Sequence, residues 1–195
     1  MNNNNTVPDF LLMAKDLTAN AQRYAGSESV KFFKESFVKE GFTDASFKAW
    51  PKTSNPMAGK RTLYGKGILM QSVRKTVQNK QRIEVESDTD YSEIQNNGGT
   101  ITVTAQMKRF FWAKYYELSG KVKQTSTGRV SHSKSNVKTS AKAEFCKRMA
   151  LMKVGTKIKI PQRQFMGNSQ TMMNQFDAFW RGQVDVVFKQ HLNKK

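Results

Sequence analysis

The sequence at residues 97–120 reads NGGTITVTAQMKRFFWAKYYELSG and holds a turn, a strand and a helix in succession. The opening Asn-Gly-Gly is a strong turn signal, and the β-branched run at 100–104 is typical of a strand. Thr104 is placed to cap the helix that follows, and Gly120 is placed to end it. A strand joined to a helix through one capping residue indicates an α+β protein.

The flanking sequence predicts further short strands and helices. Apolar residues alternate with charged ones over 73–77, 82–86 and 157–160, which predicts three strands. A helix capped by Thr139 or Ser140 should run through Met152, and a last helix should follow Ser169. We expect an α+β fold with a small antiparallel sheet flanked by helices, an N-terminal helical pair and a helix-loop-helix insertion.

The N-terminal helices are expected at residues 8–41. Pro8 and Asp9 suit a first helical turn, Gly26 interrupts the apolar spacing, and Gly41 ends it. The pattern therefore predicts two helices in place of one. Residues 43–67 are rich in proline and glycine and read as an irregular connection.

Length and composition favour one folded domain over residues 1–195. The hydrophobic fraction is 37% and the chain has 13 Phe, which is too rich for a disordered chain. The single cysteine, Cys146, excludes an internal disulfide, and the N-terminus lacks the regions of a signal peptide. The apolar runs are too short for a membrane helix, so we expect assembly in a reducing cytoplasm.

Positive charge dominates the chain and is concentrated in one segment. Lys and Arg number 33 against 15 Asp and Glu, a formal net charge of +18 that attracts polyanions. Residues 119–163 hold twelve basic residues and one acid, Glu144, and so supply +11 of that charge. Within this segment, 119–140 is too polar to pack and predicts a mobile basic insertion. We expect this insertion to contact DNA or a protein through five basic residues: Lys121, Lys123, Arg129, Lys134 and Lys138. The alternative is a solvated loop with no partner.

No residue pattern predicts catalysis, a metal or a cofactor. His132 and His191 have no Cys or carboxylate at metal-ligand spacing, and Cys146 has no histidine near it in sequence. The glycines match no phosphate-binding loop. One acidic group suits either a solvated strand edge, which we favour, or a metal-dependent nuclease: Glu84, Glu86, Asp88, Asp90 and Glu93.

Three segments resemble the phage virion morphogenesis (tail completion) family, which includes the phage Mu gene G product. Residues 90–100 read DYSEIQNNGGT and are similar to its Tyr-Ala-x-Ile-His-Asn-x-Gly-Gly strand and turn. Residues 160–167 read IPQRQFMG and resemble Ile-Pro-Ala-Arg-Pro-Phe-Leu-Gly, and 65–73 resemble a weaker upstream element. Ser92, Gln95 and Gln164 depart from the pattern. The matching residues are Tyr91, Ile94, Asn97, Gly98, Gly99, Pro161, Arg163, Phe165 and Gly167.

The resemblance implies a non-enzymatic structural protein of a phage or prophage particle. It implies a tail completion or head-tail joining (neck) subunit in a ring, commonly a hexamer, beside the tail tube, terminator and neck proteins. It also implies a virion protein assembled in the host cytoplasm, with packaged DNA as a further contact and no membrane. Two alternatives stay open, namely a free basic nucleic-acid-binding module and a nuclease built on the acidic strand.

The segment from Ile160 to Gly167 is expected to form a structural corner. Pro161 should end a strand, and Arg163 should hold backbone carbonyls or a carboxylate. Phe165 should fill the core, and Gly167 should permit the turn into the last helix.

Overall fold

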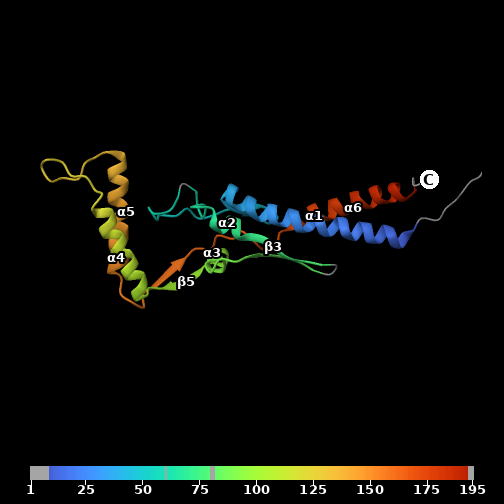
Figure 1. The fold of residues 1–195 in the computed structure, drawn as a ribbon, viewed down its shortest axis with the longest axis horizontal. Coiled ribbons are helices and arrows are strands. Elements are labelled where there is room, and N and C mark those ends of the chain that lie inside the picture. Colours follow the sequence, from blue (N-terminus) through green and yellow to red (C-terminus); the bar gives the residue numbers. More distant parts are fainter. Residues whose placement is uncertain (1–8, 60, 80–81, 193–195) are drawn as a thin grey trace, which may run out of the picture. The chain divides into compact units, whose positions relative to one another are not determined.

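The structure is a computed structural model that describes residues 9–59, 61–79 and 82–192 (Figure 1). Its fold is α+β, with three two-stranded antiparallel sheets flanked by helices, which confirms the predicted class. The described residues form two compact units. The first comprises residues 9–50, 67–79, 82–92 and 164–192, and the second comprises 51–59, 61–66 and 93–163. The single tail-completion-like domain over residues 1–195 remains a prediction.

The first unit is organised on one long helix, α1 (Phe10–Lys39), so the expected N-terminal helical pair is wrong. The Asp9 side chain caps the helix by accepting a hydrogen bond from the Leu12 amide at 2.9 Å, whereas Pro8 lies outside the described residues. Gly26 is buried inside the continuous helix, and a Cβ there would come within 2.9 Å of Lys75 Cδ. The glycine leaves room for the Lys75 side chain, and the helix runs through it despite its poor helix propensity.

Two small sheets complete the framework of this unit. β1 (Gly41–Thr43) pairs with β2 (Phe47–Ala49), where the sequence had predicted an irregular connection. After α2 (Ile68–Ser72), β3 (Val73–Gln78) pairs with β4 (Ile83–Ser87), and both of these strands were predicted. β2 is a strand because its partner supplies hydrogen bonds that its own sequence does not signal.

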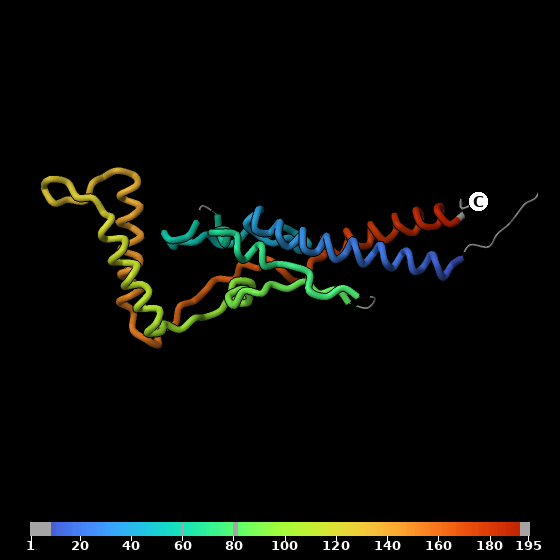
Figure 2. The backbone as a smooth tube through the Cα atoms, in the orientation of Figure 1, coloured from blue at the N-terminus to red at the C-terminus, as the bar shows by residue number. Residues whose placement is uncertain are grey.

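The last helix, α6 (Gln170–Leu192), lies along α1, as Figure 2 also shows. The core of the unit includes Phe37 and Phe165, both fully buried, with ring centroids 5.0 Å apart. Trp50 packs edge-on against Phe37 at 5.6 Å and donates its indole N–H to the Gln164 carbonyl at 2.6 Å. An aromatic cluster thus ties both ends of the chain into one core.

The second unit contains α3 (Ser92–Asn97), β5 (Gly99–Thr102), α4 (Ala105–Ser119), α5 (Lys134–Leu151) and β6 (Lys157–Ile160). The Thr104 hydroxyl caps α4 as predicted by accepting from the Met107 amide at 3.1 Å. Residues 92–97 form a helix, not the strand that the family pattern implies.

α5 begins six or seven residues earlier than predicted, because Ser133 caps it instead of Thr139 or Ser140. The Ser133 hydroxyl accepts from the Asn136 amide at 3.3 Å, while Thr139 bonds back to the Ser135 carbonyl within the helix. The loop between α4 and α5 is correspondingly shorter than the expected insertion. Among the described residues no helix has the length and apolar character needed to span a membrane.

Candidate interaction site

In the second unit, residues 93–100 of one family-like segment come together with residues 160–163 of the other. β5 and β6 pair antiparallel with Gly99 opposite Ile160, and the Arg163 amide donates to the Gln95 carbonyl at 2.8 Å. Segments some sixty positions apart in sequence therefore pair as β5 and β6, and the hydrogen bond from Arg163 to Gln95 extends the contact beyond the strands. Sequence reasoning found both segments but did not predict that they pair.

Gly98 is required by this arrangement for two reasons. Its φ angle is +72°, in the left-handed region that favours glycine. A Cβ at this position would also lie 2.8 Å from the Gln162 amide nitrogen, which is part of the backbone and cannot yield easily. The Asn-Gly-Gly turn thus fits against the chain that follows β6.

Arg163 is a buried structural residue that binds backbone, as predicted. It is 8% exposed, and its Nε donates to the Pro51 carbonyl at 3.1 Å. Burial lowers the pKa of its guanidinium below the ordinary value. Gln95, whose carbonyl accepts from the Arg163 amide, has a side-chain Oε1 that is buried without a hydrogen-bond donor among the described residues.

The other residues of the family-like segments set backbone conformation and packing. Pro161 follows the last residue of β6, and Gly167 has a φ of +140° before α6 begins. Ile94 lies against Gly99, whose Cβ would meet its side chain at 3.4 Å. Tyr91 and Asn97 are exposed, and Asn97 accepts a hydrogen bond from the Asn96 amide group at 2.9 Å. None of these side chains is paired with an acid, base or nucleophile in the part of the chain described.

α4 and α5 form a helical hairpin with a small core. Ala143, Cys146 and Ala150 are buried on one face of α5, and Phe145 packs edge-on against Phe111 of α4 at 6.2 Å. Burial raises the pKa of the Cys146 thiol, so its thiolate is disfavoured. Cys146 is therefore a buried apolar residue, as its helical position had indicated.

The loop that joins these helices is shaped by its own hydrogen bonds. We call residues 121–133 the basic finger. Gln124 bridges Val130 in antiparallel fashion, and the Thr125 amide donates to the Arg129 carbonyl at 2.7 Å around a turn at Gly128, whose φ is +77°. The finger closes at its base, where the Ser131 amide donates to the Lys123 carbonyl at 3.0 Å. The mobility predicted for this segment remains a prediction.

Asn136 anchors the finger to the first turn of α5. Its Oδ1 accepts from the Lys123 amide at 2.7 Å, and its Nδ2 donates to the carbonyls of Lys123 and Ser131 at 2.9 and 2.7 Å. Sequence reasoning missed this residue. A signal was present, because Asn136 lies seven positions before Ala143 and so on the same helix face as the buried residues.

Carboxylates neutralise little of the charge in this region. Glu117 pairs with Lys114 at 2.7 Å and with Lys121 at 2.8 Å, and these hydrogen bonds and charges lower its pKa to about 2. Every one of the five predicted contact residues is exposed. In the described chain, four of them have no ion pair: Lys123, Arg129, Lys134 and Lys138.

The remaining candidates assemble no reactive site. In the described residues no group of three His, Cys, Asp or Glu side chains could hold a metal ion. From the acidic strand, Glu84 pairs with Arg82 and Asp88 with Arg74, the latter at 2.8 Å. His132 is exposed in the finger, and His191 lies 3.0 Å from Asp16 of α1.

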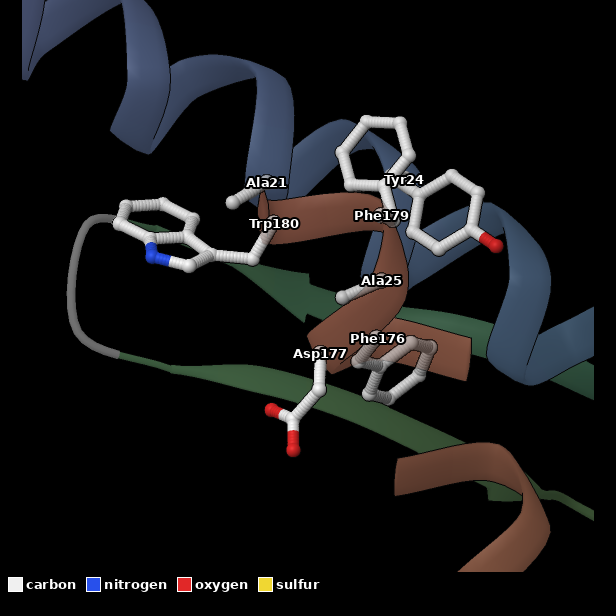
Figure 3. A pocket seen from close by; sticks show the side chains of 7 residues that line it. All are labelled: Ala21, Tyr24, Ala25, Phe176, Asp177, Phe179 and Trp180. Atoms are coloured by element: carbon white, nitrogen blue, oxygen red, sulfur yellow. The ribbon is translucent and has the colours of Figure 1, made fainter. Parts of the chain in front are cut away.

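A hollow of about 170 Å³ lies between α1 and α6 (Figure 3). Tyr24 stacks flat on Phe179 with centroids 3.7 Å apart and meets Phe176 edge-on at 6.1 Å. Asp177 is the single carboxylate in a lining that is otherwise mostly apolar, so no acid–base pair faces the space. The lining consists of Ala21, Tyr24, Ala25, Phe176, Asp177, Phe179 and Trp180.

Comparison with known proteins identifies no relative, since no family, no curated protein and no solved structure matches the chain.

Proposed function

We propose that this chain is a structural, non-enzymatic protein of a phage or prophage particle, a tail completion or neck subunit that works in a ring. The observation that carries the proposal is the pairing of the two family-like segments through Gly99 and Ile160 and through Arg163 and Gln95. Their residues set backbone geometry, as expected of segments that specify a scaffold.

Exposed apolar side chains give independent support for assembly. The first turn of α1 presents Phe10, Leu11 and Leu12, of which Leu11 is 69% exposed, and α4 presents Phe110 and Tyr116. Large exposed apolar groups favour subunit contacts, and closed symmetric assemblies bury such groups in every copy. The ring and the location in the tail rest on the family resemblance. The exposed apolar side chains give a physical reason for subunits to assemble.

The test is to follow a tagged chain through particle assembly in a host that carries the element. We expect the tag in purified particles, at the head-proximal end of the tail by immunogold electron microscopy. Light scattering of the purified chain should show whether rings form before they join tails. Exclusion of the chain from particles, with normal tails in its absence, would contradict the proposal.

A further inference from the structure

The basic finger has a hydrogen-bonded structure of its own. A single antiparallel bridge joins Gln124 to Val130, and Asn136 holds Lys123 and Ser131 with three side-chain hydrogen bonds. A segment already held in shape loses less conformational entropy when it binds a ligand. The five cations are therefore presented from a defined base.

These cations are arranged without local compensation. Between Glu117 and Glu144 the sequence has no acidic residue, and of the five cations Lys121 alone has a carboxylate partner in the described chain. α5 also begins with Lys134 and carries no acid in its first turn. The N-terminal end of a helix carries a partial positive charge, which repels nearby lysine side chains. An anion bound at the start of α5 would be attracted both by this partial charge and by the lysines.

The composition of the finger separates the classes of anionic partner. The finger has no Phe, Tyr or Trp, and its two apolar residues are Val122 and Val130, of which Val130 is exposed. Two valines are too few for the aromatic anchors of a protein interface or for an apolar face that enters a lipid surface. It carries three cations, Lys121, Lys123 and Arg129, and is rich in serine and threonine hydroxyls. These groups, with backbone amides, bind phosphate oxygens and read little sequence.

We infer that the basic finger and the start of α5 bind the phosphate backbone of nucleic acid, independent of base sequence, through Lys121, Lys123, Arg129, Lys134 and Lys138. The site goes beyond the proposed particle role and does not depend on it. The ligand class is a nucleic-acid strand or duplex, and the two share the phosphate chemistry that the site recognises.

The test measures binding of the purified full chain to a labelled DNA duplex and to a single strand by fluorescence anisotropy across salt concentrations. The finger variant replaces the five cations with Ser. A matched control replaces four lysines and one arginine that are exposed elsewhere and have no ion pair among the described residues: Lys15, Lys48, Lys52, Arg181 and Lys189. Both variants lose the same charge, and circular dichroism checks that both fold.

We expect the finger variant to bind at least about tenfold more weakly near 100 mM salt. For the duplex, the negative slope of log affinity against log salt should become shallower by about four. The control variant should stay within about threefold of the unmodified chain. Asn136→Ala keeps all five cations, so it should weaken binding several-fold while it leaves the slope unchanged.

Three results would overturn the inference. One is equal loss of binding in the finger and control variants, which would assign the effect to net charge alone. Another is salt-independent or absent binding by the unmodified chain. The third is binding to polyglutamate or to anionic vesicles as tight as to DNA of equal charge, which would point to an acidic protein or a membrane.

Discussion

Asn136 holds both backbone polar groups of Lys123, accepting from its amide at 2.7 Å and donating to its carbonyl at 2.9 Å. A side-chain amide that spans both groups acts as a substitute for a neighbouring strand. Asn136 itself is 5% exposed, so the bonds form where water does not compete freely. The finger consequently has one buried point of attachment beyond the chain itself.

Asn136→Ala should destabilise the hairpin by about 1–3 kcal/mol, because it leaves the Lys123 amide and the Ser131 carbonyl without a partner and removes one of the two hydrogen bonds to the Lys123 carbonyl. The measurement is the free energy of unfolding by urea, with hydrogen exchange at the Lys123 amide as the local readout. Ser135→Ala, at the exposed neighbouring position, is the control and should change stability by less than about 0.5 kcal/mol. An unchanged exchange rate at Lys123 would contradict the anchoring role.

Phe165→Ala should destabilise the first unit by about 3–5 kcal/mol. Its side chain is fully buried and packs against Phe37, so truncation leaves a cavity that rigid aromatic neighbours fill poorly. Phe10→Ala is the matched control, since Phe10 is 58% exposed at the start of α1. Equal effects of the two changes in thermal unfolding would show that Phe165 is not a core residue.

Gly98→Ala should cost more stability than Gly128→Ala. Both glycines have left-handed φ angles, +72° and +77°, so both substitutions carry about 1–2 kcal/mol of backbone strain. At Gly128 a new Cβ meets nothing within 4 Å, whereas at Gly98 it meets the Gln162 amide at 2.8 Å. Denaturant unfolding of the two variants isolates the added steric cost, and equal values would refute the close approach at Gly98.

The carboxyl of Glu117 should titrate with a pKa of about 2, below its ordinary value of 4.5, because Lys114 and Lys121 hydrogen-bond to it. A carboxyl with a lowered folded-state pKa contributes stability above its ordinary pKa, and that contribution is lost as the pH falls from about 4.5 to about 2. Carbon NMR of the Glu117 side chain measures the pKa directly.

Lys114→Met should raise this pKa toward its ordinary value, and added salt should raise it too, because the group is exposed to solvent. Lys108→Met, on the same helix, should leave it in place. A Glu117 pKa near 4.5 in the unmodified chain would contradict the two ion pairs.

Cys146 should react with maleimide on the order of 100-fold more slowly in the native chain than in denaturant. Its side chain is fully buried and its thiol pKa is raised by burial, so the reactive thiolate forms when the hairpin opens. Ser135→Cys in a Cys146→Ser background supplies an exposed thiol for comparison. Equal native rates at the two positions would mean that α4 and α5 do not pack closely.

Much of the secondary structure follows from short stretches of sequence. Thr104 caps α4, Ser169 caps α6 by accepting from the Met172 amide at 3.1 Å, and Pro161 follows β6 directly. Each feature depends on groups within three or four residues, so the local chain carries enough information to predict it.

Prediction was wrong where a distant partner decides the outcome. Gly26 was expected to break the N-terminal helix, yet α1 continues through it and packs against β3, β4 and α6. The start of α5 was placed too late, because Ser133 caps the helix; Asn136 in its first turn also bonds Lys123 and Ser131 across the loop. Helix propensity and the spacing of apolar residues contain no information about these tertiary contacts.

By itself the sequence determined the α+β class, the β3 and β4 strands, the capped helix after Gly98 and Gly99, and the concentration of charge in 119–163, because these depend on residue type and near neighbours. Only the tertiary structure decided that β5 pairs with β6 and that Asn136 closes the basic finger. Hydrogen bonds between residues far apart in the chain must first offset the entropy of closing the intervening loop, and the three-dimensional packing supplies that compensation.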